Sequence, residues 1–196
     1  MKKVLFAIGL ATFGCIGAAD AQLQKGNTTW GGSITDMNFG LKSGQGWNIG
    51  ITPRVGYFIK DNVLVGGYGD LNLSKAGSGN PTKSEYGIGA FSRYYAKPGD
   101  VNNLLNHGRF FAEANAGFGG SSQKGQPTTN GFAFGFGPGY SYFLTPSIGL
   151  EGLVKYNGIV GGGNTTYQHN ITFGIGFQVY LPSSKIKAMA KDPKSL

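Results

Sequence analysis

Apolar residues alternate with polar residues or glycines through most of this sequence, and this two-residue period restricts its fold more than any other feature. The clearest row lies near the C-terminal end, where Ile171, Phe173, Ile175, Phe177, Val179 and Leu181 alternate with Asn170, Thr172, Gly174, Gly176, Gln178 and Tyr180. Similar rows run from Phe132 to Tyr142 and from Trp47 to Ile59. Successive side chains of a β-strand point to opposite faces, so the pattern predicts strands with one apolar face.

Turn residues divide the alternating region into eight expected strands, at 28–41, 47–59, 63–73, 85–95, 109–119, 130–143, 148–157 and 168–181. Each is near or above the roughly 9–11 residues that a tilted strand needs to cross a bilayer. The first strand changes parity between Ile34 and Met37, and a β-bulge near Thr35 and Asp36 would restore it. An even number of strands places both ends of the chain on one side, which is the periplasm for an outer-membrane barrel.

The first 21 residues have the pattern of a secretory signal peptide. Lys2 and Lys3 precede an uncharged run that ends at Ala19-Asp20-Ala21, so cleavage is expected before Gln22. A membrane anchor and lipoprotein processing at Cys15 are the alternatives. The expected organisation is a signal peptide at 1–21, a barrel at 22–181 and a basic periplasmic tail at 182–196. Removal of the signal also removes the single cysteine.

Charges in the expected strands favour a membrane barrel over a soluble one. In strands two to eight every charged residue falls on the parity opposite the apolar row: Arg54, Asp70, Glu85, Arg93, Arg109, Glu113, Glu151 and Lys155. An Arg or Lys that faces lipid at mid-depth costs about 2–4 kcal/mol, so its exclusion is expected. Four basic and four acidic residues predict an ion-pair network in a poorly hydrated lumen. The expected pairs are Arg54 with Asp70 and Arg93 with Glu113.

The composition of the two parities supports the same orientation. The apolar rows are too bulky for the interior of an eight-stranded barrel, whereas the opposite parity is crowded with glycine, of which the chain has 36. Aromatic residues also gather at the expected strand ends, where they would form interface girdles. The periplasmic group is Tyr57, Phe58, Tyr94, Tyr95, Phe110, Phe111, Tyr140, Tyr142, Phe143 and Tyr180, and the outer group is Trp47, Tyr86 and Tyr156.

Three stretches resemble the small outer-membrane β-barrel family of OmpA-like and OmpX-like proteins. They read ITPRVGYFIKDNVLVGG from Ile51 to Gly67, EYGIGAFSRYY from Glu85 to Tyr95, and GPGYSYFLTPS from Gly137 to Ser147. The resemblance implies an all-β fold, an eight-stranded antiparallel up-and-down transmembrane β-barrel, with a location in the bacterial outer membrane and a monomeric state. It implies no particular activity, because this fold hosts structural proteins, adhesins, channels and enzymes.

The leading functional expectation is a non-enzymatic structural or surface-interaction protein whose lumen is closed by ion pairs. The alternatives are a narrow gated channel and a barrel enzyme that modifies lipids. An enzyme would need a nucleophile, a base and an orienting acid within reach of each other, and His107 and His169 are the only histidines. Neither has a serine or carboxylate at a telling spacing, so no catalytic residue, metal site or cofactor is predicted.

The expected partners are outer-membrane lipids and lipopolysaccharide, with peptidoglycan as a possible ligand of the basic tail. The formal net charge is +8, but Lys2 and Lys3 belong to the signal peptide and four further lysines lie in the tail. The charge is therefore local, and the sequence has no interleaving of basic and aromatic residues that would favour nucleic-acid binding. The outer loops are short and polar, which leaves adhesion as a further, weaker expectation.

Overall fold

The computed structural model describes residues 23–39, 45–97, 108–125, 128–162 and 167–183. The expected signal peptide, most of the expected tail and His107 lie outside these residues. Eight strands make up the fold: β1 (Thr28–Phe39), β2 (Gln45–Lys60), β3 (Val63–Gly77), β4 (Lys83–Tyr95), β5 (Gly108–Gln123), β6 (Thr129–Thr145), β7 (Ile148–Gly162) and β8 (Tyr167–Leu181). All eight predicted strands are confirmed, and most of them extend further than the alternation indicated.

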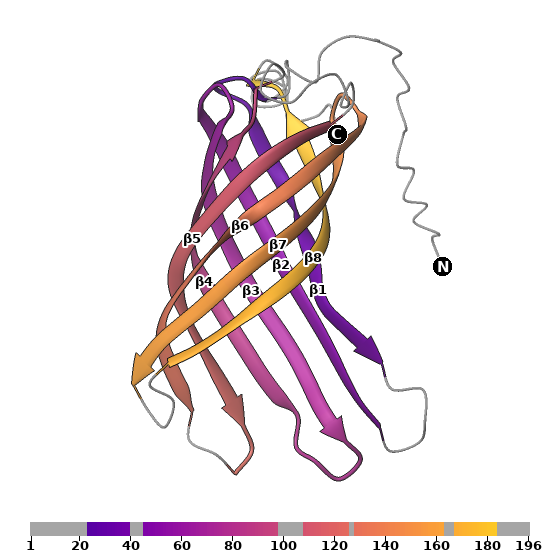
Figure 1. The fold of residues 1–196 in the computed structure, drawn as a ribbon, viewed down its shortest axis with the longest axis vertical. Coiled ribbons are helices and arrows are strands. Elements are labelled where there is room, and N and C mark those ends of the chain that lie inside the picture. Colours follow the sequence, from indigo (N-terminus) through magenta and orange to yellow (C-terminus); the bar gives the residue numbers. More distant parts are fainter. Residues whose placement is uncertain (1–22, 40–44, 98–107, 126–127, 163–166, 184–196) are drawn as a thin grey trace, which may run out of the picture.

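The strands form one closed antiparallel barrel in which each pairs with its neighbours in the sequence and β1 pairs with β8 (Figure 1). Closure pairs the edges that an open sheet would expose, which is what a bilayer demands of a β-structure. No helix of the described residues is long and apolar enough to cross a membrane. The closed antiparallel arrangement of the eight strands confirms the fold class expected from the sequence.

The two ends of the barrel differ. One end carries the close β2–β3 and β6–β7 connections and the pair Thr28–Leu181, and we call it the turn end. The opposite end, called the loop end, carries the connections from β1 to β2, β3 to β4, β5 to β6 and β7 to β8. The β2–β3 turn places Asn62 at a φ of 64°. Asparagine is one of the few residues that tolerate this left-handed conformation.

The register of β1 confirms the expected bulge. Its pairing with β2 is regular from Thr28 to Thr35 and shifts before Asn38. Between these two pairs β1 has one residue more than β2, so the parity of the strand reverses there. The side chain of Asp36, which the bulge was expected to turn inward, lies outside the described side chains.

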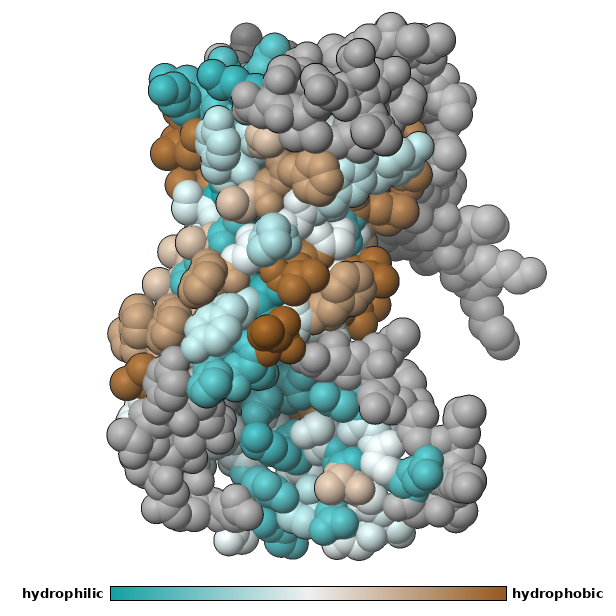
Figure 2. Space-filling model, in the orientation of Figure 1, coloured by the Kyte–Doolittle hydropathy of each residue, from teal (hydrophilic) through white to brown (hydrophobic). Residues whose placement is uncertain are grey.

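The apolar rows face outward. Ile171, Phe173, Ile175 and Phe177 of β8 are 53–74% exposed, and other strands show the same pattern. Figure 2 shows brown apolar side chains across the middle of the visible face and teal polar side chains around the hollow at the loop end. Such a belt is typical of a surface that lipid covers. The opposite parity, which carries the predicted charges, lines the lumen.

Candidate functional site in the lumen

Buried ion pairs cross the lumen. Glu113 on β5 accepts hydrogen bonds through Oε2 from Arg54 Nη1 on β2 and from Arg93 Nη2 on β4, each at 2.8 Å. Arg93 also donates from Nη1 to Glu151 Oε1 on β7 at 2.7 Å. The four side chains are at most 6% exposed. They form a continuous chain of alternating charge from one wall of the barrel to the other, which we call the ionic layer.

Further hydrogen bonds and a ring contact stabilise the charges of Glu151 and Arg93. The Glu151 carboxylate also accepts from Ser141 Oγ at 2.8 Å and from Tyr180 OH at 3.2 Å. The Arg93 guanidinium carbon lies 3.9 Å from the ring centroid of Phe111, and its Nη1 donates to Tyr95 OH at 3.0 Å. A buried charge is tolerated only when its partners satisfy it in this way. Removal of one partner would therefore leave the others unbalanced.

The arrangement differs from the expected pairs in one respect. Arg93 and Glu113 stand opposite each other in the β4–β5 register, and their expected pairing is present. Arg54 was expected to pair with Asp70, and this prediction was wrong. Arg54 stands opposite Tyr68 and reaches across the lumen to Glu113, whereas Asp70 Oδ1 accepts a hydrogen bond from Thr52 Oγ1 at 2.5 Å.

The other predicted lumen residues lie outside the ionic layer, toward the loop end or toward the turn end. Glu85 pairs with Lys83 at 2.5 Å near the loop end, where both side chains are more than one-third exposed. Arg109 is buried near the turn end, and its Nη1 donates to the carbonyl of Gly108 at 3.0 Å. Lys155 is buried, and its Nζ lies 5.8 Å from the ring centroid of Tyr68. The structure therefore joins four of the eight predicted residues into one network.

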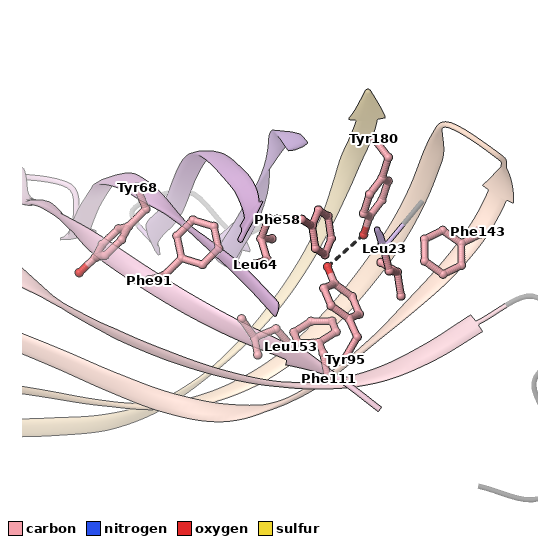
Figure 3. Close-up of a cluster of buried hydrophobic side chains, with 10 residues drawn as sticks. All are labelled: Leu23, Phe58, Leu64, Tyr68, Phe91, Tyr95, Phe111, Phe143, Leu153 and Tyr180. Carbon is pink, nitrogen blue, oxygen red and sulfur yellow. Dashed lines mark hydrogen bonds between the residues drawn. The ribbon is translucent and has the colours of Figure 1, made fainter. Parts of the chain in front are cut away.

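A second layer, which was not predicted from the sequence, fills the turn end of the lumen. Its aromatic rings come from β2, β4, β5, β6 and β8, and Figure 3 shows them converging. They are Phe58, Tyr95, Phe111, Phe143 and Tyr180, each at most 7% exposed. Neighbouring rings lie 5.4–6.5 Å apart between centroids. We call this set, with Leu23, the aromatic layer. The prediction that these five residues belong to an outward girdle is wrong, because their rings lie inside the lumen.

The inward direction of these rings follows from their position in the two-residue period of each strand. Phe58, Tyr95 and Phe111 share the parity of the lumen residues Arg54, Arg93 and Glu113 in their own strands, so their rings point inward. The adjacent residues Tyr57, Tyr94, Phe110 and Tyr142 point outward and are 45–49% exposed, as a girdle requires. Gly139 makes room for one of the inward rings, because a Cβ added there would lie 2.2 Å from Phe111 Cζ.

The chain segment before β1 folds into the turn end. Leu23 is 1% exposed, and its carbonyl accepts a hydrogen bond from the Asn62 amide at 2.8 Å. The amides of Gly26 and Lys25 donate to the Phe58 carbonyl at 2.9 Å and to Asp61 Oδ1 at 2.8 Å. These contacts hold Leu23 against the rings (Figure 3). No pattern in the sequence indicated this, because the segment does not alternate.

A cavity of about 660 Å³, lined by both polar and apolar side chains, occupies the lumen between the ionic layer and the loop end. Its lining includes Ser33, Thr52, Tyr68, Asn115, Asn157 and Thr172, together with Arg54, Asp70 and Lys155. Figure 2 shows a hollow between teal side chains at the loop end. Within the described part of the chain, no group of three or more His, Cys, Asp or Glu side chains could hold a metal ion.

Solved structures resemble this barrel, although no family model and no curated protein matches its sequence. Neisserial surface protein A aligns over 78% of this chain and 94% of its own, with a TM-score of 0.54 and 19% identity. The fold is that of a small outer-membrane β-barrel. This confirms the fold that the resemblance of the sequence implied.

Two Pseudomonas aeruginosa proteins are similar at lower scores. The N-terminal β-barrel domain of OprF is 13% identical, with a TM-score of 0.48, over 81% of this chain and all of that domain. The outer membrane protein OprG is 12% identical, with a TM-score of 0.47, over 82% of this chain and 98% of its own.

Proposed function

We propose that this chain is a non-enzymatic protein of the bacterial outer membrane, with a structural or surface-interaction role and a lumen closed to solutes. The observation that carries the proposal is the buried chain of charges from Arg54 through Glu113 and Arg93 to Glu151. An ion or solute that passed would have to separate these groups in a space where water does not replace their bonds. Separation of a buried pair leaves uncompensated charge and costs several kcal/mol.

The aromatic layer gives closure a second, independent basis. Its rings and Leu23 pack between the ionic layer and the turn end, so a path through the barrel meets a polar barrier and then an apolar one. An apolar constriction excludes ions because it cannot hydrate them. Two barriers of opposite chemistry favour a closed lumen over an open pore.

Conductance across a planar bilayer tests the closure. Purified wild-type protein is expected to give no openings, and so is Arg93→Ala, because the aromatic layer remains in that variant. A known open porin inserted under the same conditions is the positive control. Steady conductance of the wild-type protein would contradict the proposal.

The outer-membrane location rests on the apolar belt and on the fold. It requires export, so we expect residues 1–21 to be removed as a signal peptide and the mature monomer to contact lipid and lipopolysaccharide. The tail at 182–196 is basic and would reach peptidoglycan from the periplasmic side. Outer-membrane fractionation, with a heat-dependent change in gel migration, tests this part. Recovery in the soluble fraction with no shift on heating would contradict it.

A narrow gated channel is the second candidate, and the cavity favours it. The cavity extends from the loop end to Arg54, so within the described residues the two layers separate it from the turn end. If Arg54 exchanged Glu113 for Asp70, which lines the same cavity, the ionic layer would loosen. Rare openings of the wild-type protein that become frequent in Arg54→Ala would support a gate. Silence in both proteins would exclude it.

The non-enzymatic part of the proposal predicts that His169 does not act as a catalytic base. Its ring is exposed on β8, and its centroid lies 6.0 Å from that of Tyr156. A rim histidine whose ring lies tilted against a tyrosine suits a structural role better than that of a catalytic base. Lipid profiles of cells that express the wild type or His169→Ala test this point. A modified lipid that depends on His169 would contradict it.

A further inference from the structure

We propose that the lumen cavity binds a small oxyanion, with Lys155 as the principal cationic ligand and Arg54 as the second. Lys155 projects from β7 into the lumen, is 8% exposed and contributes to the cavity lining. Within the described residues, no carboxylate oxygen lies within 4.0 Å of its Nζ. A buried ammonium group that forms no direct ion pair is costly, and a bound anion would reduce that cost.

The surroundings of Lys155 add donors that suit an oxyanion. The Nε of Arg54 and the Oγ of Ser33 are buried without a hydrogen-bond partner, and both residues line the cavity. Arg54 uses Nη1 for Glu113, so a second edge of the guanidinium is available for another acceptor. Unsatisfied buried donors are uncommon in native proteins and call for an explanation. A bound oxyanion that accepts from Lys155 and these groups supplies one.

The size and polarity of the cavity limit the ligand class. At about 660 Å³ the cavity exceeds a single ion, and Asn115, Asn157 and Thr172 place amide and hydroxyl groups around it. These side chains would hydrogen-bond a hydroxylated body attached to the anionic group. The ligand chemistry is therefore a carboxylate, sulfate or phosphate group, either free or on a small polar molecule.

Two acidic side chains line the cavity, and Asp70 provides a test because Glu85 already pairs with Lys83 near the loop end. Asp70 lines the same cavity, and its carboxylate accepts from Thr52. Its charge would repel an anion, whereas Asp70→Asn keeps the shape and removes the charge. A cavity that binds anions should therefore respond in opposite directions to Asp70→Asn and Lys155→Gln. A change that only disturbed packing would weaken binding in both variants.

Isothermal titration calorimetry of the folded full chain in detergent, at low ionic strength in Tris-chloride, measures the binding. Sodium acetate, sulfate and phosphate are titrated separately, which distinguishes a carboxylate site from a tetrahedral-oxyanion site. We expect saturable binding of at least one anion. Lys155→Gln should weaken it about tenfold or more, which is the scale of a hydrogen bond to a charged group. Asp70→Asn should tighten it, and Lys155→Arg should retain it.

The matched control is Lys60→Gln, which removes an exposed lysine at the turn end, away from the cavity. It should bind like the wild type. Each variant is first checked for the heat-dependent gel shift of the folded barrel. The proposal is overturned if no anion binds saturably to the wild type, if Lys155→Gln binds like Lys60→Gln, or if Asp70→Asn weakens binding. If Lys155→Gln does not fold, Asp70→Asn and Lys155→Arg still decide the matter.

Discussion

Glu113 is the group whose neutralisation should cost this barrel most. Its Oε2 accepts from Arg54 and Arg93 at 2.8 Å each, and the three side chains are at most 5% exposed. Glu113→Gln keeps the volume and one carbonyl acceptor but leaves two buried guanidinium groups to share Glu151. Loss of one partner of a buried pair typically costs about 3–5 kcal/mol. We expect a loss of that size in the free energy of unfolding.

Urea unfolding of the protein in lipid vesicles, followed by tryptophan fluorescence and by the heat-dependent gel shift, would measure this loss. The control is Glu85→Gln, which breaks the exposed pair with Lys83 and should cost about 1 kcal/mol or less. Adding Arg54→Met to Glu113→Gln leaves one cation, Arg93, against one anion, Glu151. This double variant should therefore be more stable than Glu113→Gln alone. A Glu113→Gln variant within 1 kcal/mol of the wild type would refute the account of the ionic layer.

Substitutions at three further positions test the turn end and the outer surface, each by the same unfolding measurement. Leu23→Ala should cost about 2–5 kcal/mol, because the side chain is buried among the rings of the aromatic layer; a cost near zero would mean that the segment before β1 does not pack there. Asn62→Ala should cost about 1–2 kcal/mol and Asn62→Gly much less, because φ is 64° at this position; equal costs would contradict the backbone argument. Phe173→Arg should cost about 2–4 kcal/mol in a bilayer if its exposed ring faces lipid near mid-depth, and a neutral result would contradict that placement.

The alternation of the sequence was enough to predict the barrel because a two-residue period assigns every strand residue to one of two faces. It placed all eight strands and the bulge in β1. It also identified the lumen residues that carry charge, and Arg93 and Glu113 pair as expected because the β4–β5 register sets them opposite each other.

The errors came from contacts that neighbouring strands do not determine. Arg54 bridges from β2 to β5 through the lumen, and a long guanidinium side chain can do this because the barrel is narrow. Phe58 and Tyr95 share the parity of the charged lumen residues in their strands, which predicts that they point inward. The usual place of aromatic girdles at strand ends predicts the opposite direction, and for these two residues it is wrong. Leu23 precedes the first strand, where no period applies, so only the three-dimensional structure places it.

The hydroxyl group of Tyr180 tests whether the two layers act as one unit. It donates to Glu151 Oε1 at 3.2 Å and lies 3.1 Å from Tyr95 OH, while its ring packs against Phe58 and Phe143. Tyr180→Phe keeps the ring and removes one of the donors to a buried carboxylate, so it should cost about 1–3 kcal/mol.

The matched control is Tyr57→Phe, which removes the hydroxyl group of a half-exposed, outward ring and should change little. If the layers are coupled, the effects of Tyr180→Phe and Glu151→Gln will not add, and their interaction energy should fall between about 0.5 and 3 kcal/mol. The hydroxyl group can help Glu151 only while that residue carries its charge, so the double variant should lose less than the sum of the single losses. Strictly additive losses would mean that the aromatic layer fills the turn end without stabilising the charges of the neighbouring ionic layer.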